Sequence, residues 1–189
     1  MKIKYFFICL AVVMLSAGCV FNLYKESLGT EELGPNDAFI YGYFDDGNEN
    51  NGIQWVKVLM SKNNEKNQAR YWAFAAYAKK GFFFNGRLTA PSKYQITGLW
   101  NGYDFSLPGG DIRVIDKPGI YYYGAYKLAR IDYVKETFVV ENTGDVDECD
   151  VLLSIINLCK GSRWEARLKE RLAKICPEKA KAGGASEPK

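Results

Sequence analysis

Residues 120–128 read IYYYGAYKL, and this stretch decides how the rest of the chain is interpreted. Aromatic and β-branched residues favour strands, and successive side chains of a strand lie on opposite faces of a sheet. A regular strand would therefore place one set of alternating residues on each face. The first set is Ile120, Tyr122, Gly124, Tyr126 and Leu128, and the second is Tyr121, Tyr123, Ala125 and Lys127.

Seven further runs have a similar composition and are bounded by turn residues, which predicts strands. They span 38–44, 54–60, 70–78, 81–84, 93–100, 111–115 and 137–140, and the alanines of 70–78 would also suit a helix. Three Asn-Gly pairs predict hairpin turns, because both residues accept positive φ angles. These pairs are Asn51-Gly52, Asn85-Gly86 and Asn101-Gly102. We expect an antiparallel β-sandwich of about seven or eight strands over residues 37–141.

Helical periodicity replaces the strand pattern after residue 141, which predicts a helical hairpin over 142–176, packed on the sandwich. The first helix should begin near the capping sequence Asp145–Glu148 and end at Gly161. The second should begin at Ser162–Glu165 and end before Pro177. Residues 177–189 are poor in apolar side chains, so we expect a disordered tail. The expected apolar stripes are Leu152, Ile155, Ile156 and Cys159, then Trp164, Leu168, Leu172 and Ile175.

Three cysteines follow the β-rich region, and the hairpin limits how they pair. Cys149 and Cys159 would lie about 15 Å apart on one helix, beyond the Cα separation of about 7 Å that a disulfide allows. Cys149 and Cys176 lie at similar distances from the turn and become neighbours in an antiparallel hairpin. We predict a Cys149–Cys176 disulfide with Cys159 free and buried; three buried thiols are the alternative.

The N-terminus has the layout of a signal peptide: a basic start, an uncharged apolar run from Tyr5 to Leu15, and small residues. Leu15-Ser16-Ala17-Gly18-Cys19 resembles the lipobox of bacterial lipoproteins. That resemblance implies removal of residues 1–18, acylation of Cys19 with chains such as palmitate, and a tether over 19–36. Val20 after the cysteine points to the outer membrane. An uncleaved membrane anchor is the alternative, because 20 residues separate Lys4 from Lys25.

The order of the β-rich pieces resembles transthyretin-like modules, such as carboxypeptidase regulatory domains. The residues that carry this resemblance are FIYGYF at 39–44, GFFFNGRLTAPSKYQITGL at 81–99 and KPGIYYYGAYKL at 117–128. Ser92 stands where the family has a glycine. The resemblance implies a β-sandwich that binds or supports other proteins and carries no catalytic residues.

The composition argues against several classes of function. The chain contains no histidine, so Ser-His and Cys-His nucleophiles and imidazole metal sites are excluded. Loss of Lys2 and Lys4 with the signal peptide would lower the net charge from +3 to about +1, which leaves no strong field for nucleic acid. We expect no enzyme, no cofactor and no metal. The loop from Asp45 to Gly52 resembles a calcium loop in part, but a polar hairpin tip is the preferred interpretation.

Two surface features are candidate binding sites. Arg163, Arg167 and Arg171 form an i, i+4 stripe, which we interpret as a solvated helix face; anionic lipid headgroups are an alternative partner. The aromatic turn at 100–105 could stack on sugars or anchor a protein. Its candidate binding residues are Trp100, Asn101, Tyr103 and Phe105.

The sequence therefore predicts a lipid-anchored protein of the bacterial cell envelope that acts as a non-catalytic structural or interaction module. Its expected partners are the membrane, through the lipid on Cys19, and another envelope protein. A glycan or cell-wall binding module that uses the 100–105 loop is the alternative. A hydrolase that uses a pair of carboxylates is a third possibility.

Overall fold

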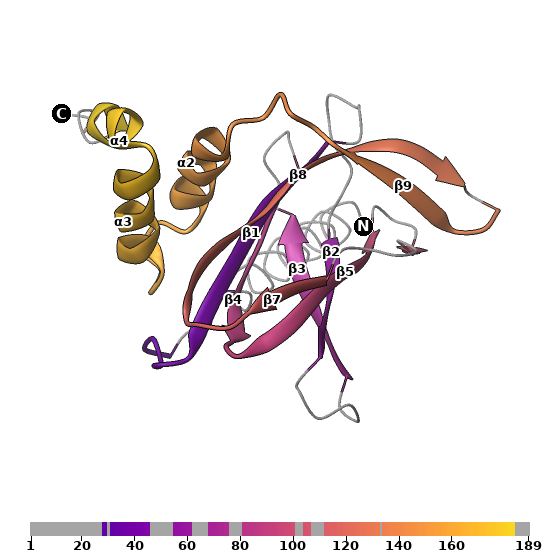
Figure 1. The fold of residues 1–189 in the computed structure, drawn as a ribbon, viewed down its shortest axis with the longest axis horizontal. Coiled ribbons are helices and arrows are strands. Elements are labelled where there is room, and N and C mark those ends of the chain that lie inside the picture. The colour runs from indigo at the N-terminus through magenta and orange to yellow at the C-terminus, as the bar shows by residue number, and fades with distance from the viewer. Residues whose placement is uncertain are drawn as a thin grey trace, which may run out of the picture.

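The computed structural model describes residues 28–29, 31–45, 55–61, 68–75, 81–100, 104–106, 112–132 and 134–183. In this part of the chain, strands come first and helices follow (Figure 1). The predicted class, mainly β with C-terminal helices, is confirmed.

A mixed sheet of four strands forms the centre of the molecule. Strand β1 (Asp37–Asp45) pairs antiparallel with β4 (Gly81–Thr89) on one side and parallel with β8 (Gly119–Asp132) on the other. Strand β9 (Thr137–Asn142) pairs antiparallel with β8. The expectation of an all-antiparallel sheet is therefore wrong at β1 and β8. A parallel pair needs a long crossover connection, and the strands between β1 and β8 in sequence provide it.

The other strands form a second set, in which β5 (Ser92–Trp100) pairs with three neighbours. Strand β2 (Trp55–Ser61) lies antiparallel to both β3 (Gln68–Ala75) and β5. The short strands β6 (Asp104–Ser106) and β7 (Ile112–Ile115) also pair antiparallel with β5. Over the described residues, the backbone pairing of this set with the central sheet is brief: β3 pairs with β4 at Phe74 and Ala75, and β6 pairs with β9 at Ser106.

A β-bulge in β8 changes which residues share a face. The β1 register steps from Tyr122 to Gly124, so Tyr123 has no partner in β1. Gly124 has a φ of +127°, a conformation that glycine adopts at low cost. The side chains beyond the bulge therefore exchange faces relative to the regular alternation. One core contains Tyr121, Tyr123, Tyr126 and Leu128, and the other contains Ile120, Tyr122 and Ala125.

The pair Asn85-Gly86 lies inside β4 and does not form the predicted hairpin turn. The register with β1 steps between Ala38 and Ile40 at this point, which marks an irregularity in the pairing. Asn85 is buried, and its side-chain oxygen accepts a hydrogen bond from the Arg87 amide at 2.9 Å. Asn-Gly thus produces a local distortion of a continuous strand here, because the residues on both sides of it pair with β1.

The central sheet is buried on both faces. One face packs into a core that includes Ile40, Phe83 and Phe138 with Tyr94 of β5 and Ile115 of β7. The other face, which includes Phe39 and Phe84, packs against the helices (Figure 1). Each large apolar side chain buried in this way contributes about 1.5–3 kcal/mol.

Helix α2 (Glu148–Leu158) and helix α3 (Glu165–Ile175) form the predicted helical region. Both stripes are buried as expected except at Ile175, which is partly exposed. The caps differ from the prediction. The N-cap of α2 is Asp147, whose carboxylate accepts the Cys149 amide at 3.1 Å. At α3, Glu165 accepts the Gly161 amide at 2.6 Å.

The expected disordered tail is wrong for its first seven residues, which form helix α4 (Pro177–Gly183). Lys179 lies 2.9 Å from a carboxylate oxygen of Asp147 and 2.6 Å from one of Asp150. Ala180 packs on the helical core. Composition alone predicts disorder here because it does not include these tertiary contacts. Residues 184–189 lie outside the described residues.

Candidate functional site

The described residues that precede β1 are held against the domain. Cys19 itself lies outside the described residues. Leu28 is only 6% exposed, and residues 31–36 continue directly into β1. The expected tether over 19–36 is therefore packed on the domain at its described residues, 28–29 and 31–36. Among the described residues, no helix has the length and apolar character that a membrane crossing requires.

One arginine of the helical hairpin holds this segment, and we call the arrangement the Arg163 clasp. The Arg163 guanidinium donates to four backbone carbonyls and forms an ion pair with Asp37. The carbonyls belong to Leu28 at 2.9 Å, Glu31 at 3.1 Å, Glu32 at 3.2 Å and Gly86 at 2.8 Å, and the ion pair measures 3.0 Å. The five contacts join four parts of the chain: the segment before β1, the first residue of β1, strand β4 and the turn before α3.

Gly86 allows the clasp to form because it has no side chain. Its carbonyl also accepts a hydrogen bond from the indole nitrogen of Trp164 at 3.0 Å. A Cβ atom at position 86 would collide with that nitrogen and lie 2.9 Å from the Phe39 ring. Trp164 is fully buried and its ring centroid lies 5.1 Å from that of Phe39. The clasp is thus built on a close approach of α3 to the sheet.

A groove of about 650 Å³ opens beside the clasp, and we call it the N-terminal groove. It lies between the segment before β1, the end of β4 and the start of α3. Gly29 and Gly34 contribute backbone without side chains to its walls. Its lining residues are Gly29, Glu31, Glu32, Gly34, Asp37, Arg87 and Arg163.

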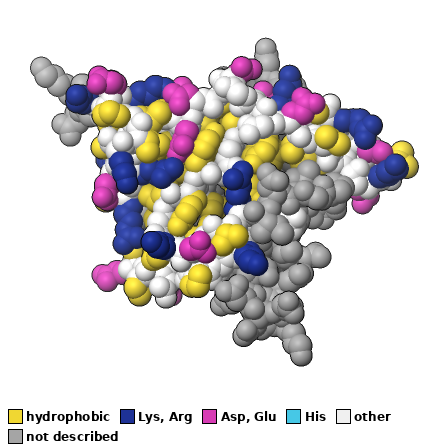
Figure 2. Space-filling model, in the orientation of Figure 1, with side chains coloured by type: hydrophobic (Ala, Val, Ile, Leu, Met, Phe, Trp, Pro, Cys, Tyr) yellow, Lys and Arg dark blue, Asp and Glu magenta, His cyan; other side chains and the backbone are white. Residues whose placement is uncertain are grey.

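The charges of the N-terminal groove fall into two groups. Arg163 and Asp37 neutralise each other within the clasp. Arg87 and the two glutamates, Glu31 and Glu32, are exposed. In the described part of the chain these three residues form no ion pair within 4.0 Å, although all three line the groove. Elsewhere, the face shown in Figure 2 carries basic and acidic side chains intermixed.

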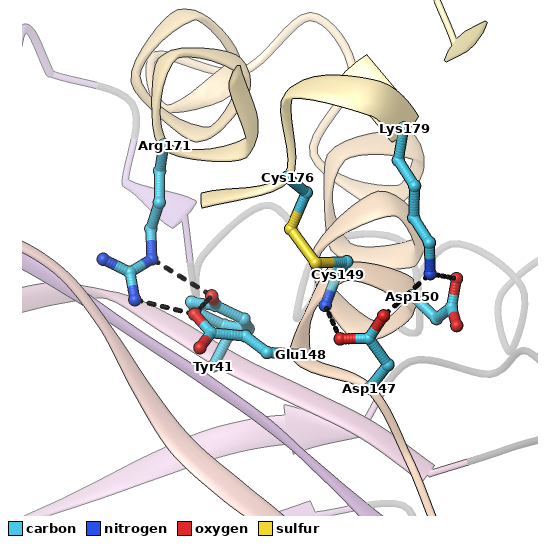
Figure 3. The surroundings of a disulfide bond; sticks show 8 residues. All are labelled: Tyr41, Asp147, Glu148, Cys149, Asp150, Arg171, Cys176 and Lys179. Atoms are coloured by element: carbon cyan, nitrogen blue, oxygen red, sulfur yellow. Dashed lines mark hydrogen bonds and ion pairs between the residues drawn. A yellow bond between two sulfur atoms is a disulfide. The ribbon is translucent and has the colours of Figure 1, made fainter. Parts of the chain in front are cut away.

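A second polar cluster joins the helices to β1 (Figure 3). Glu148 accepts hydrogen bonds from the Tyr41 hydroxyl at 2.5 Å and from Arg171 at 2.7 Å, and Arg171 also donates to Tyr41 at 3.1 Å. Burial, together with the bond to Glu148, raises the pKa of Tyr41 above its ordinary value. Burial and the nearby Glu148 carboxylate raise the pKa of Tyr122 to about 12. These groups stay protonated at neutral pH and act as structural contacts.

The predicted pairing of cysteines agrees with the geometry. Cys149 and Cys176 form a disulfide with a Cα–Cα separation of 6.0 Å, beside the Lys179 bridges (Figure 3). Cys159 is free and fully buried. Burial, and secondarily Glu165, raises the pKa of the Cys159 thiol, which makes it unreactive at neutral pH.

The arginine stripe is not the solvated face that the sequence predicts. Arg163 and Arg171 are both partly buried and bonded to distant residues, and only Arg167 is exposed as expected. No local signal identifies the acceptors of Arg163, because some of them lie more than 130 residues away in sequence. The sequence analysis therefore missed the clasp and the groove.

The aromatic turn remains a prediction. The backbones of Trp100 and Phe105 belong to β5 and β6, where Trp100 pairs with Asp104 and Leu99 with Phe105. Asn101 and Tyr103 lie outside the described residues, so the proposed sugar-binding surface is untested. Most of the calcium-like loop, 46–52, also lies outside them. Over the described ranges, no group of three or more potential metal ligands occurs.

None of the protein-family models, curated proteins or solved structures that were searched matches this chain.

Proposed function

We propose that this protein is a lipid-anchored, non-catalytic interaction module of the bacterial cell envelope. The Arg163 clasp is the observation that carries this proposal. It fixes the described residues before β1, which begin nine residues after the predicted lipid cysteine, through four carbonyls and one ion pair. A lipid at Cys19 would therefore hold one defined end of the domain towards the membrane.

The chain length limits how far that end lies from the bilayer. Nine residues lead from Cys19 to Leu28, and a fully extended chain covers about 30 Å over that length. Strand β8 starts beside Ala38 at the clasped end and has 14 residues, or about 46 Å at 3.3 Å per residue. The β8–β9 hairpin would thus project away from the anchor, with Val134 at its tip 95% exposed. That position suits contact with another envelope protein.

We further propose that the strands form a β-sandwich with a helical layer on one face. A core cluster that combines β1, β4, β8 and β9 with Tyr94 of β5 and Ile115 of β7 supports two facing layers of strands. The resemblance to transthyretin-like modules implies a binding or supporting role. Several charged groups of the helical region form ion pairs, and Arg171 with Glu148 is one of them. We assign no nucleic-acid partner and place the protein at the outer membrane, on the strength of Val20.

The first test is the chemical state of Cys19 in cells. Mass spectrometry of the full-length expressed chain should find residues 1–18 removed and Cys19 acylated, and Cys19→Ala should abolish both. A photo-crosslinking residue at position 134 should then capture one recurrent protein at near-equal amount, while the same residue at Lys93 serves as control. An unacylated protein that retains its signal sequence would refute the anchor. Equal capture from both positions would refute the hairpin as the partner site.

A further inference from the structure

The N-terminal groove carries opposite charges that do not satisfy each other. Arg87 lies on the β4 side, and Glu31 and Glu32 lie on the segment before β1. No ion pair within 4.0 Å joins these groups in the described part of the chain, although all three line the same hollow. The Arg163 clasp keeps the two sides in place, so the gap between the charges is a fixed feature of the domain.

This arrangement suits a small ligand that carries both signs of charge. A guanidinium binds phosphate through parallel N–H···O bonds, and carboxylates accept hydrogen bonds from an ammonium group. The volume of about 650 Å³ lies within the range of small-molecule sites. A purely anionic ligand would meet the two glutamates unfavourably.

The position of the groove indicates where such a ligand would come from. The groove begins at Gly29, next to Leu28 and about 30 Å or less of extended chain from Cys19. On the proposed function, on which this step rests, the groove opens at the end of the domain that lies next to the bilayer. A bilayer presents zwitterionic phosphate-and-ammonium headgroups at high density. Both the charges of the N-terminal groove and its expected position beside the bilayer therefore fit a zwitterionic lipid headgroup.

We propose that the N-terminal groove binds the headgroup of phosphatidylethanolamine, with its phosphate at Arg87 and its ammonium group at Glu31 and Glu32. Such binding would orient the anchored domain on the membrane surface. Phosphatidylcholine lacks the ammonium N–H donors that the glutamates require, and phosphatidylglycerol lacks the positive charge.

Hydrogen exchange of the full-length chain, purified from cell membranes, tests this assignment. The protein is placed in nanodiscs of phosphatidylcholine containing either phosphatidylethanolamine or phosphatidylglycerol, and exchange is followed at residues 28–37 and 86–90. A parallel arm adds soluble glycerophosphoethanolamine to protein in phosphatidylcholine discs. We expect slower exchange with phosphatidylethanolamine and with the soluble headgroup. Arg87→Gln should weaken the response to the soluble headgroup about tenfold or more, and Lys93→Gln should leave it unchanged.

The outcomes are distinguishable. Equal protection by phosphatidylglycerol, or an unchanged response in Arg87→Gln, would overturn the proposal. Protection by the soluble headgroup alone, in a protein whose mass shows an acylated Cys19, would overturn the bilayer as the source. An unacylated Cys19 would refute the anchored function instead, while the soluble arm would still decide the chemistry of the groove.

Discussion

Replacing Arg163 with alanine should remove the clasp and destabilise the protein. The Arg163 and Asp37 side chains are 15% and 18% exposed, so their ion pair lies closer to the buried case than to the surface case. Breaking a buried pair costs about 3–5 kcal/mol, whereas a surface pair is worth about 0–1. The hydrogen bonds to the carbonyls of Leu28 and Gly86 add about 1 kcal/mol each. Water can replace the bonds to Glu31 and Glu32, because both residues are exposed.

We therefore expect Arg163→Ala to lower the free energy of unfolding by about 4–6 kcal/mol, of which the ion pair supplies about 2–4 and the two hydrogen bonds the rest. Arg163→Lys should cost about half as much, because an ammonium group can still pair with Asp37 but cannot reach both groups of carbonyls. Urea unfolding with the disulfide intact measures the loss, and hydrogen exchange at residues 31–36 shows whether the segment detaches. Arg167→Ala is the matched control and should stay within about 0.5 kcal/mol of the wild type. If Arg163→Ala behaves like Arg167→Ala, the clasp does not hold the segment and the reasoning is wrong.

Three further predictions concern the helical side of the molecule. Gly86→Ala should cost about 1–3 kcal/mol in urea unfolding, because its Cβ would collide with Trp164. Cys149→Ser should cost about 3–4 kcal/mol, given a sequence separation of 27 between the bridged residues. It should also add one free thiol, at Cys176, which is counted by labelling after denaturation because Cys176 is buried. Tyr122 has a folded pKa raised from 10.0 to about 12, so its contribution to stability is complete below pH 10 and is lost as pH rises towards 12.

The controls for these predictions use nearby positions. Gly144→Ala should be close to neutral, because no atom lies within 4 Å of a Cβ there. Thiol labelling of the oxidised native protein should leave Cys159 unmodified, and rapid labelling would contradict its burial. Tyr122→Phe should flatten the stability curve between pH 10 and 12. An unchanged curve would show that another group titrates there.

The helical hairpin was the part of the fold most open to prediction from sequence. Its apolar residues recur at helical spacing, and both helices form where that spacing places them. The Cys149–Cys176 pairing followed from the same local geometry, because helix rise and turn position fix which cysteines meet. The capping pattern predicts Asp145 as the N-cap of α2, whereas the structure has Asp147 there. Several acids at this point can cap the helix, and the sequence alone does not rank them.

The sheet was less predictable because strand pairing depends on partners distant in sequence. The composition of residues 120–128 predicts a strand, but the bulge at Gly124 arises where β8 meets the register of β1. Likewise, Asn85-Gly86 has the composition of a turn, yet pairing with β1 keeps it within a strand. Local preference is weak against a full set of interstrand bonds.

The sequence by itself determined the β-then-α order, the two helices and the disulfide pair, and it is the sole basis of the predicted lipid at Cys19. These features depend on neighbours a few residues apart, which periodicity and spacing record. Only the tertiary structure decided the parallel pairing of β1 with β8, the docking of residues 28–36 and the charges that face the N-terminal groove. Each of these brings together groups separated by tens of residues or more, as Arg163 and Leu28 do. The strand pairing depends on interstrand hydrogen bonds, and the Arg163 contacts depend on the packing of the helical region against the sheet; no local pattern encodes either.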